Sequence, residues 1–188
     1  MGATIPWESR LELHDLYRVE VDPAICSYGV QPETLYWRNG EMRRRYTPDR
    51  LDVLADGSER IIEVKDVFDP AADPDYTEKL SQAALIYKAL GRSFEIRDGA
   101  AIRSEPSFSA FEEVQAYRRA IVTVDDIAGI QRCLRSRPLP ICEVLRSMRG
   151  AHPRPTLFAL MTRRVVSIDL TFGLKDATLV SLIESAQR

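Results

Sequence analysis

The sequence has few histidines, few cysteines and no long apolar run, and each shortage disfavours a class of protein. Its two histidines, His14 and His152, stand far apart with no partner at ligand spacing, which argues against a histidine-based hydrolase. The three cysteines contain no C-x-x-C pair and leave an odd one over, so a disulfide framework or a zinc knuckle is not expected. No apolar run approaches the ~18 residues that a membrane helix needs.

The amino end also lacks a basic region followed by an apolar one, as a signal peptide would have. We therefore expect a soluble cytoplasmic protein with no membrane partner. Of its 188 residues, 45% are hydrophobic and 29% are charged, which is typical of a globular protein. Residues 1–120 carry 16 basic and 22 acidic residues, whereas residues 121–188 carry 10 and 6. This asymmetry, with the change of pattern near residue 121, predicts two domains, 1–120 and 121–188.

The first part reads as a helix followed by strands. Apolar spacing predicts a helix over Trp7–Val19, which Asp22-Pro23 ends, and a strand around Ile25–Val30. Asn39-Gly40 marks a hairpin. A second hairpin turns at Asp56-Gly57, between Leu51-Asp52-Val53-Leu54 and Arg60-Ile61-Ile62-Glu63-Val64-Lys65. A helix over Tyr76–Leu90, a short strand at Phe94–Arg97 and a helix over Phe108–Ala120 complete an α/β pattern.

The register of the second hairpin decides which side chains share a face. A three-residue loop with Gly57 in the left-handed conformation would set Leu54 against Ser58 and Asp49 against Glu63. Period-two alternation then puts Asp49, Glu63 and Lys65 on one face. A two-residue loop would turn Asp49 away from Glu63.

The second part predicts a small helical module. Helices are expected from Thr123-Val124-Asp125-Asp126 onward, over Ile141–Met148 and over Thr156–Arg163, followed by a strand at Val165–Leu170. Three short helices followed by a strand is the order of a winged helix-turn-helix.

Pro48-Asp49, followed after thirteen residues by Glu63-Val64-Lys65, has the form P-D-x(n)-E-x-K. Hydrolysis of a phosphodiester near neutral pH needs a divalent cation to activate water and neutralise charge. Mg²⁺ prefers hard oxygen ligands, and Asp49, Glu63 and the Val64 carbonyl would supply them. Lys65, on the same face, is placed to orient the attacking water or to stabilise charge in the transition state.

Several blocks in this order resemble the TnsA family, the endonuclease subunit of heteromeric transposases, within the PD-(D/E)XK nuclease superfamily. The resemblance covers about residues 5–100. Its blocks are Ser9-Arg10-Leu11-Glu12-Leu13, Val21-Asp22-Pro23, Gln31-Pro32, Arg45-Tyr46-Thr47-Pro48-Asp49 and Glu63-Val64-Lys65, continuing through Glu78-Lys79-Leu80, Tyr87 and Phe94-Glu95-Ile96.

The resemblance implies a restriction-endonuclease-like core, a mixed sheet flanked by helices, with a small winged-helix-like C-terminal domain. It implies a catalytic set of Glu12, Asp49, Glu63 and Lys65. Of the two glutamates on the first helix, Glu8 and Glu12, we favour Glu12 because it lies deeper in the apolar stripe. The cofactor would be Mg²⁺, with Mn²⁺ as a substitute. The partners would be double-stranded DNA, a DDE-type transposase and an ATP-dependent regulator.

Five further residues are candidates for contact with DNA. Gln31 would support the site or a phosphate, or would instead cap the turn before Pro32. Lys79 follows the site on the next helix. Arg154, Arg163 and Arg164 flank the third helix of the C-terminal module, where a winged helix would meet a duplex or a protein partner.

Two other functions remain open at the level of sequence. One is a stand-alone PD-(D/E)XK nuclease of the restriction or phage type. The other is a DNA-binding or assembly protein that keeps the nuclease fold without activity.

Overall fold

A computed structural model of the chain describes residues 9–183, and these fall into two compact units. The first unit includes described residues 9–15 and 24–102, and the second includes 16–23 and 103–183. The expected boundary lay between residues 120 and 121. The units divide at 102 instead because Ala110 and Val114, in the helix before residue 120, are buried in the core of the second unit.

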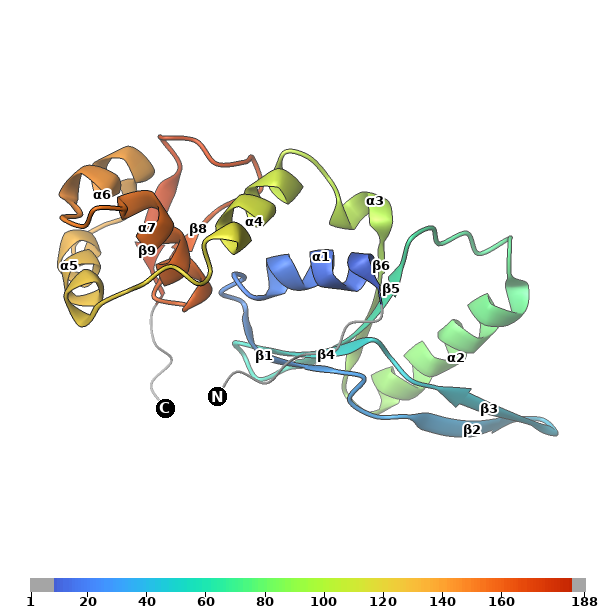
Figure 1. Cartoon of the computed structure of the whole chain (residues 1–188). Coiled ribbons are helices and arrows are strands. Elements are labelled where there is room, and N and C mark those ends of the chain that lie inside the picture. The colour runs from blue at the N-terminus through green and yellow to red at the C-terminus, as the bar shows by residue number, and fades with distance from the viewer. Residues whose placement is uncertain (1–8, 184–188) are drawn as a thin grey trace. The chain divides into compact units, whose positions relative to one another are not determined.

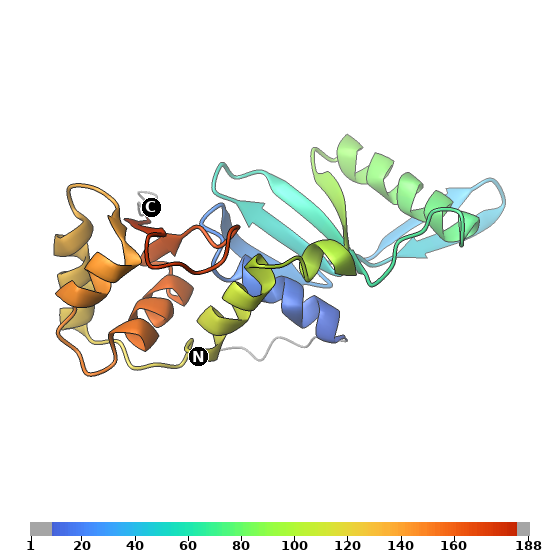
Figure 2. The same cartoon turned by 90° about the horizontal axis from the view of Figure 1, so that it is seen from above.

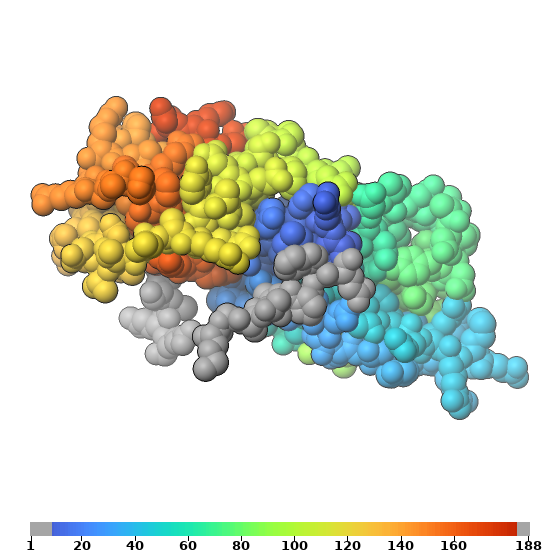
Figure 3. Space-filling model, viewed as in Figure 1, coloured from blue at the N-terminus to red at the C-terminus, as the bar shows by residue number. Residues whose placement is uncertain are grey.

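The first unit is built on a mixed sheet. Its strands are β1 (Ile25–Val30), β2 (Leu35–Asn39), β3 (Met42–Tyr46), β4 (Arg50–Leu54), β5 (Glu59–Lys65) and β6 (Ser93–Asp98). Four of them form a sheet in the order β1-β4-β5-β6, in which only β5 and β6 are parallel (Figure 1). β2 and β3 form the separate hairpin expected around Asn39-Gly40, and it extends past the four-stranded sheet (Figures 2 and 3).

Helices cover both faces of this sheet. They are the start of α1 (Arg10–Val19), α2 (Pro74–Ala89) and α3 (Gly99–Ile102). On one face, Ile62 and Val64 of β5 pack with Leu11 of α1. On the other face, Ile61 packs with Leu80 and Tyr87 of α2. A strand with apolar side chains on both faces is typical of a sheet that lies between helices. The helix expected over Trp7–Val19 is described from Arg10, and Trp7 and Glu8 lie outside the described residues.

The hairpin of β4 and β5 has the three-residue loop that the sequence predicts. The Leu54 N–H donates to the Ser58 carbonyl over 2.8 Å, and Gly57 has a φ of 82°, in the left-handed region. Arg50 then pairs with Ile62. This register sets Asp49, the next residue back, against Glu63, so the predicted parity is confirmed.

The second unit packs helices around a small sheet. Its helices are α4 (Ser107–Ala116), α5 (Val124–Leu134), α6 (Ile141–Ser147) and α7 (Pro153–Thr162), and its strands are β7 (Leu139–Pro140), β8 (Val166–Ile168) and β9 (Leu179–Leu182). The strands are antiparallel in the order β7-β9-β8. Leu157, Phe158 and Leu160 of α7 are fully buried in its core. The expected three helices and the strand after them are present as α5, α6, α7 and β8, and the two-residue strand β7, which the sequence pattern did not predict, lies between α5 and α6.

No helix among the described residues is both long and apolar enough to cross a bilayer.

Candidate active site

The predicted catalytic residues of the hairpin come together where β4 begins and β5 ends. Asp49 directly precedes β4, and Glu63 and Lys65 lie in the last residues of β5. Glu63 is 3% exposed, whereas Asp49 is half-buried at the edge of the same site. Lys65 Nζ lies 2.8 Å from Glu63 Oε1. The site therefore holds two carboxylates and an ammonium group, as the P-D-x(n)-E-x-K pattern predicts.

Asp49 is oriented by the backbone of the neighbouring strand. Its Oδ2 accepts a hydrogen bond of 2.7 Å from the Val64 N–H, and its own carbonyl accepts one of 3.0 Å from the Gln31 N–H. In this register Val64 lies opposite Pro48, and the N–H and carbonyl of Val64 point toward β4. Pro48 has no N–H, so it cannot donate to the Val64 carbonyl. The β4–β5 register ends at Arg50 and Ile62, and beyond it the Val64 N–H donates to the side chain of Asp49.

The surroundings of Asp49 disfavour its charged form. Burial, followed by the nearby negative charge of Glu63, raises the pKa of Asp49 to about 6. The charge of Glu12 acts in the same direction, while the Val64 N–H and the Lys65 ammonium group oppose the shift. Two neighbouring carboxylates, Glu63 and Glu12, thus act on the charge of Asp49 at this point of the fold. A cation placed among them would relieve this repulsion.

Glu63 is held by hydroxyl groups as well as by Lys65. The Tyr46 hydroxyl donates to Oε2 over 2.7 Å, and the Tyr76 hydroxyl donates to Oε1. Burial and the charge of Glu63 raise the pKa of both phenols, that of Tyr76 to about 12. Both tyrosines therefore stay protonated at neutral pH and act as donors that orient the carboxylate.

Two lysines give the site its positive charge. Burial alone would lower the pKa of Lys65, but hydrogen bonds with Glu63 and Tyr76 outweigh it and hold the pKa above its ordinary value. Lys79 Nζ lies 4.7 Å from the ring centre of Tyr76 and 6.0 Å from that of Tyr46. Lys79, predicted as a DNA contact, therefore stands beside the two rings that hold Glu63.

Glu12 lies in the first turn of α1. Its Oε1 accepts a hydrogen bond of 2.9 Å from the Ser9 hydroxyl, whose oxygen in turn accepts one of 3.2 Å from the Glu12 N–H. This reciprocal pair is a local helix cap. Glu12 is half-buried and its charge reaches Asp49, whereas Glu8, the alternative acid, lies outside the described residues.

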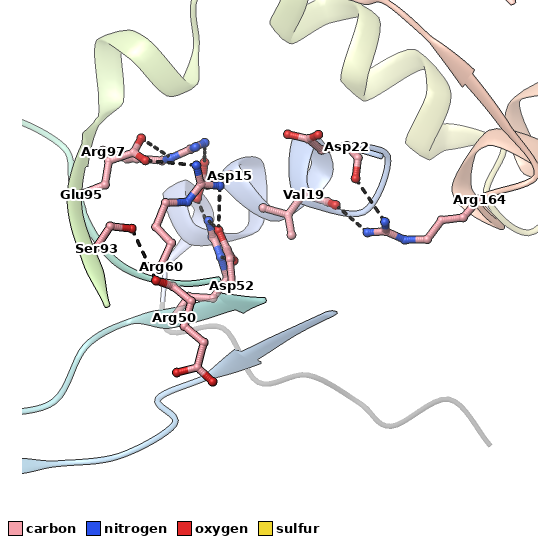
Figure 4. Close-up of polar contacts among 11 residues, drawn as sticks. Asp15, Val19, Asp22, Arg50, Asp52, Arg60, Ser93, Glu95, Arg97 and Arg164 are labelled. Carbon is pink, nitrogen blue, oxygen red and sulfur yellow. Dashed lines mark hydrogen bonds and ion pairs between the residues drawn. The ribbon is translucent and has the colours of Figure 1, made fainter. Parts of the chain in front are cut away.

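A buried ion-pair network joins the start of α1 to the sheet in the first unit (Figure 4). Asp15, which is 1% exposed, contacts Arg50 through Oδ2 and Arg97 through Oδ1, the second pair at 3.1 Å. Arg50 also contacts Asp52 at 2.6 Å. Asp15 lies one turn after Glu12, and Arg50 directly follows Asp49. The network therefore connects the elements that carry two of the candidate catalytic acids.

The donor set fits a hard divalent cation. Within residues 9–183, no three histidine, cysteine, aspartate or glutamate side chains are gathered closely enough to hold a metal ion by themselves. Mg²⁺ is usually bound by one or two carboxylates, with water and substrate phosphate filling its other positions. Asp49 and Glu63 supply two such carboxylates. The residues that would hold an ion are these two acids and the Val64 carbonyl, and within the described residues the structure does not gather Glu12 with the two acids into a three-carboxylate group.

The remaining predicted DNA contacts lie in different surroundings. Gln31 is exposed and has a positive φ of 45°, and its N–H donates a hydrogen bond to the Asp49 carbonyl. In the second unit, Arg154 forms an ion pair of 2.9 Å with Glu113. The Arg163 guanidinium donates to the Ala120 carbonyl over 3.0 Å.

Arg164 caps the end of α1 within the second unit. It donates to the Asp22 and Val19 carbonyls, each over 3.1 Å (Figure 4). Arg154, Arg163 and Arg164 thus all have structural contacts, and their binding of DNA stays a prediction.

Sequence reasoning missed the residues that support the site. Tyr46 belongs to a quoted block, but it lies in a hairpin outside the main sheet, so alternation along β4 could not place it. Tyr76 reaches Glu63 through tertiary packing of α2, for which the sequence gives no signal. Asp15 follows Glu12 by three residues, and that helical spacing was the available clue.

Comparison with known proteins adds no relative to these observations: no family model matches the chain, and neither does any curated protein sequence.

Proposed function

We propose that this chain is a metal-dependent DNA endonuclease with a PD-(D/E)XK core. The observation that supports this best is the meeting of Asp49, Glu63 and Lys65 at one end of a mixed sheet flanked by helices. Two acids whose charges interact, with an ammonium group at 2.8 Å from one of them, suit the hydrolysis of an anionic ester. The proposed substrate is therefore the phosphodiester backbone of duplex DNA.

Each residue has a distinct part in the proposed reaction. Asp49 and Glu63 would bind the cation, and Glu12 would add a third negative charge. The ion, when bound, would supply the water activation and charge neutralisation that the reaction needs. Lys65 would stabilise charge as it develops on the phosphate. Tyr46 and Tyr76 would hold Glu63 in position through its two oxygens.

The test is nicking, in Mg²⁺ or Mn²⁺, of supercoiled plasmid that carries transposon-end DNA, by the chain alone and together with the proposed transposase. Asp49→Asn and Lys65→Ala should each reduce nicking by at least about a hundredfold, on the scale of removing one transition-state contact. Glu112→Gln and Lys88→Ala are matched controls, because both residues are exposed and lie outside the site. Full cleavage by both site variants would refute the assignment.

We further propose that the chain acts as a TnsA-like subunit that cuts at transposon ends beside a DDE-type transposase and an ATP-dependent regulator. This rests on the resemblance of residues 5–100. The order of helices and strands in the second unit supports its winged-helix-like part. Cleavage of transposon-end DNA only when the transposase is added would support the subunit role. Nicking of generic plasmid by the chain alone would favour a stand-alone nuclease.

One observation favours a second candidate, a DNA-binding or assembly protein without activity. Glu63 is already satisfied by Tyr46, Tyr76 and Lys65 without an ion. Calorimetric titration with Mn²⁺ separates the two functions. The nuclease should bind the ion and lose binding in Asp49→Asn, whereas the inactive protein should bind none in either form.

A further inference from the structure

The face of the β2–β3 hairpin that is turned away from α2 carries three arginines and a tyrosine. Tyr36 pairs with Arg45, and Arg38 pairs with Arg43. Because side chains alternate along a strand, these four share one face. All four are exposed, and Tyr36 is 74% exposed.

The opposite face of the hairpin packs against α2, so the face that carries Tyr36 and the three arginines is the exposed one. The Trp37 indole N–H donates to Gln82 over 2.7 Å, and Arg44 forms a hydrogen bond of 2.9 Å with Asp75. Arg44 is the middle member of the Arg43-Arg44-Arg45 run. The structure therefore uses the middle arginine for packing and directs its two neighbours outward.

This arrangement costs stability. Arg38 and Arg43 face each other directly, and like charges in that position repel. Among residues 9–183, neither they nor Arg45 form an ion pair that would offset the repulsion. The single acid of the hairpin, Glu41, lies in the turn. Three arginines on one exposed face, with no ion pair to any residue between 9 and 183, make a surface suited to an anion with several charges.

We propose that this face, Tyr36, Arg38, Arg43 and Arg45, binds the phosphate backbone of duplex DNA. The proposal rests on the proposed function, because it identifies where the substrate of that site would lie. A two-stranded ribbon is of a size that fits against a groove of DNA, and arginine binds phosphate through paired N–H groups.

The position of the ribbon next to the site supports this ligand. β3 ends at Tyr46, whose hydroxyl donates to Glu63. At a rise of ~3.3 Å per residue, Arg43 lies only about 10 Å along the strand from Tyr46. Tyr46 points to the opposite face of the ribbon from Arg43 and Arg45. A duplex that placed one phosphate at the site would therefore meet the arginine face with an adjacent stretch of its backbone, around the edge of the ribbon.

The experiment measures binding of the full chain to a labelled duplex in EDTA, without cleavage, over a series of salt concentrations. Each lost phosphate contact should flatten the slope of log affinity against log salt by about 0.9. The triple variant Arg38→Gln, Arg43→Gln, Arg45→Gln should therefore flatten it by about 2.7. The matched control replaces Lys88, Arg118 and Arg119, three exposed cations elsewhere, and should leave the slope unchanged.

A second readout separates binding from folding. Removal of the repulsion between Arg38 and Arg43 should leave the thermal midpoint of the triple variant equal to or above that of the wild type. An unchanged slope, or wild-type protein that does not bind the duplex, would overturn the proposal. The proposal would also be overturned if the triple variant lost the ability to bind polyglutamate, an acidic polypeptide, while it still bound DNA like the wild type. That result would indicate an acidic protein partner. Because no cleavage is measured, this result does not depend on the nicking assay.

Discussion

At the scale of single residues, the two acids of the site have opposite surroundings. Glu63 is buried but receives donors from two hydroxyls and an ammonium group. Asp49 has one backbone donor and two neighbouring negative charges, and its pKa rises to about 6. Keeping a carboxylate at this position thus costs the fold stability, as is common at functional sites.

This shift predicts how stability depends on pH. Between about pH 4 and 6 the folded protein binds more protons at Asp49 than the unfolded chain does, so the free energy of unfolding falls as the pH rises. The substitution Asp49→Asn removes the ionisable group and, with it, this pH-dependent loss of stability. The variant should therefore be more stable than wild type above about pH 6, with the difference disappearing below about pH 4, as measured by urea unfolding.

Two further measurements check the cause. Nicking by the wild type should increase as the pH rises through about 6, where Asp49 becomes charged and able to bind a cation. Mg²⁺ should stabilise the wild type more than Asp49→Asn, since a ligand that binds only the folded state shifts unfolding. A variant less stable than wild type at pH 8, without metal, would contradict the prediction.

At the scale of elements, buried ion pairs fix α1 to the sheet. Asp15 contacts Arg50 and Arg97, and both arginines are almost fully buried. The carboxylate stands at the junction of helix and strands, with Glu12 one turn before it. Its removal would take one carboxylate from each of two buried arginines, leaving Arg50 with Asp52 and Arg97 with Glu95.

Asp15→Ala should therefore destabilise the protein by about 3 kcal/mol, the lower end of the usual effect of breaking a buried pair from one side, because each arginine keeps one carboxylate. Nicking should fall as well, because Glu12 would lose its fixed position beside Asp49. Urea unfolding measures the first effect and plasmid nicking the second. Glu112→Ala, an exposed acid on α4, serves as the control. A loss below about 1 kcal/mol would show that the network does not hold the helix.

At the scale of the whole molecule, the chain does not divide where its composition changes. Val21, which precedes β1 in the sequence, is 4% exposed in the core of the second unit. In that unit, Arg164 also contacts the carbonyls of Val19 and Asp22. A segment near the amino end is thus part of a unit formed otherwise by residues after 102.

This organisation predicts that the chain cannot be cut cleanly at residue 102. A fragment of residues 103–188 would lack Val21 and the two carbonyls that Arg164 contacts. We expect it to unfold at a lower urea concentration than the corresponding transition of the full chain. Addition of a peptide covering residues 16–23 should raise its midpoint. If the fragment alone were as stable as the full chain, segment 16–23 would have no part in that core.

Much of the first unit could be predicted from local signals. Asp56-Gly57 indicated the length of the loop. The loop length fixed which residues of β4 and β5 lie opposite each other, and this register placed Asp49 opposite Glu63. Each step depends on backbone geometry within about fifteen residues, which a sequence records directly. The helix over α2 and the strand after it followed from apolar periodicity in the same way.

What the sequence by itself determined is the pair of acids, the lysine and the strand face that they share, because turn chemistry and period-two alternation are local properties. Tertiary structure alone decided that Tyr46 and Tyr76 hold Glu63, that Asp15 meets two buried arginines, and that segment 16–23 joins the second unit. These contacts join residues from separate elements, and the free energy that selects them comes from burial in a common core rather than from any short stretch of chain.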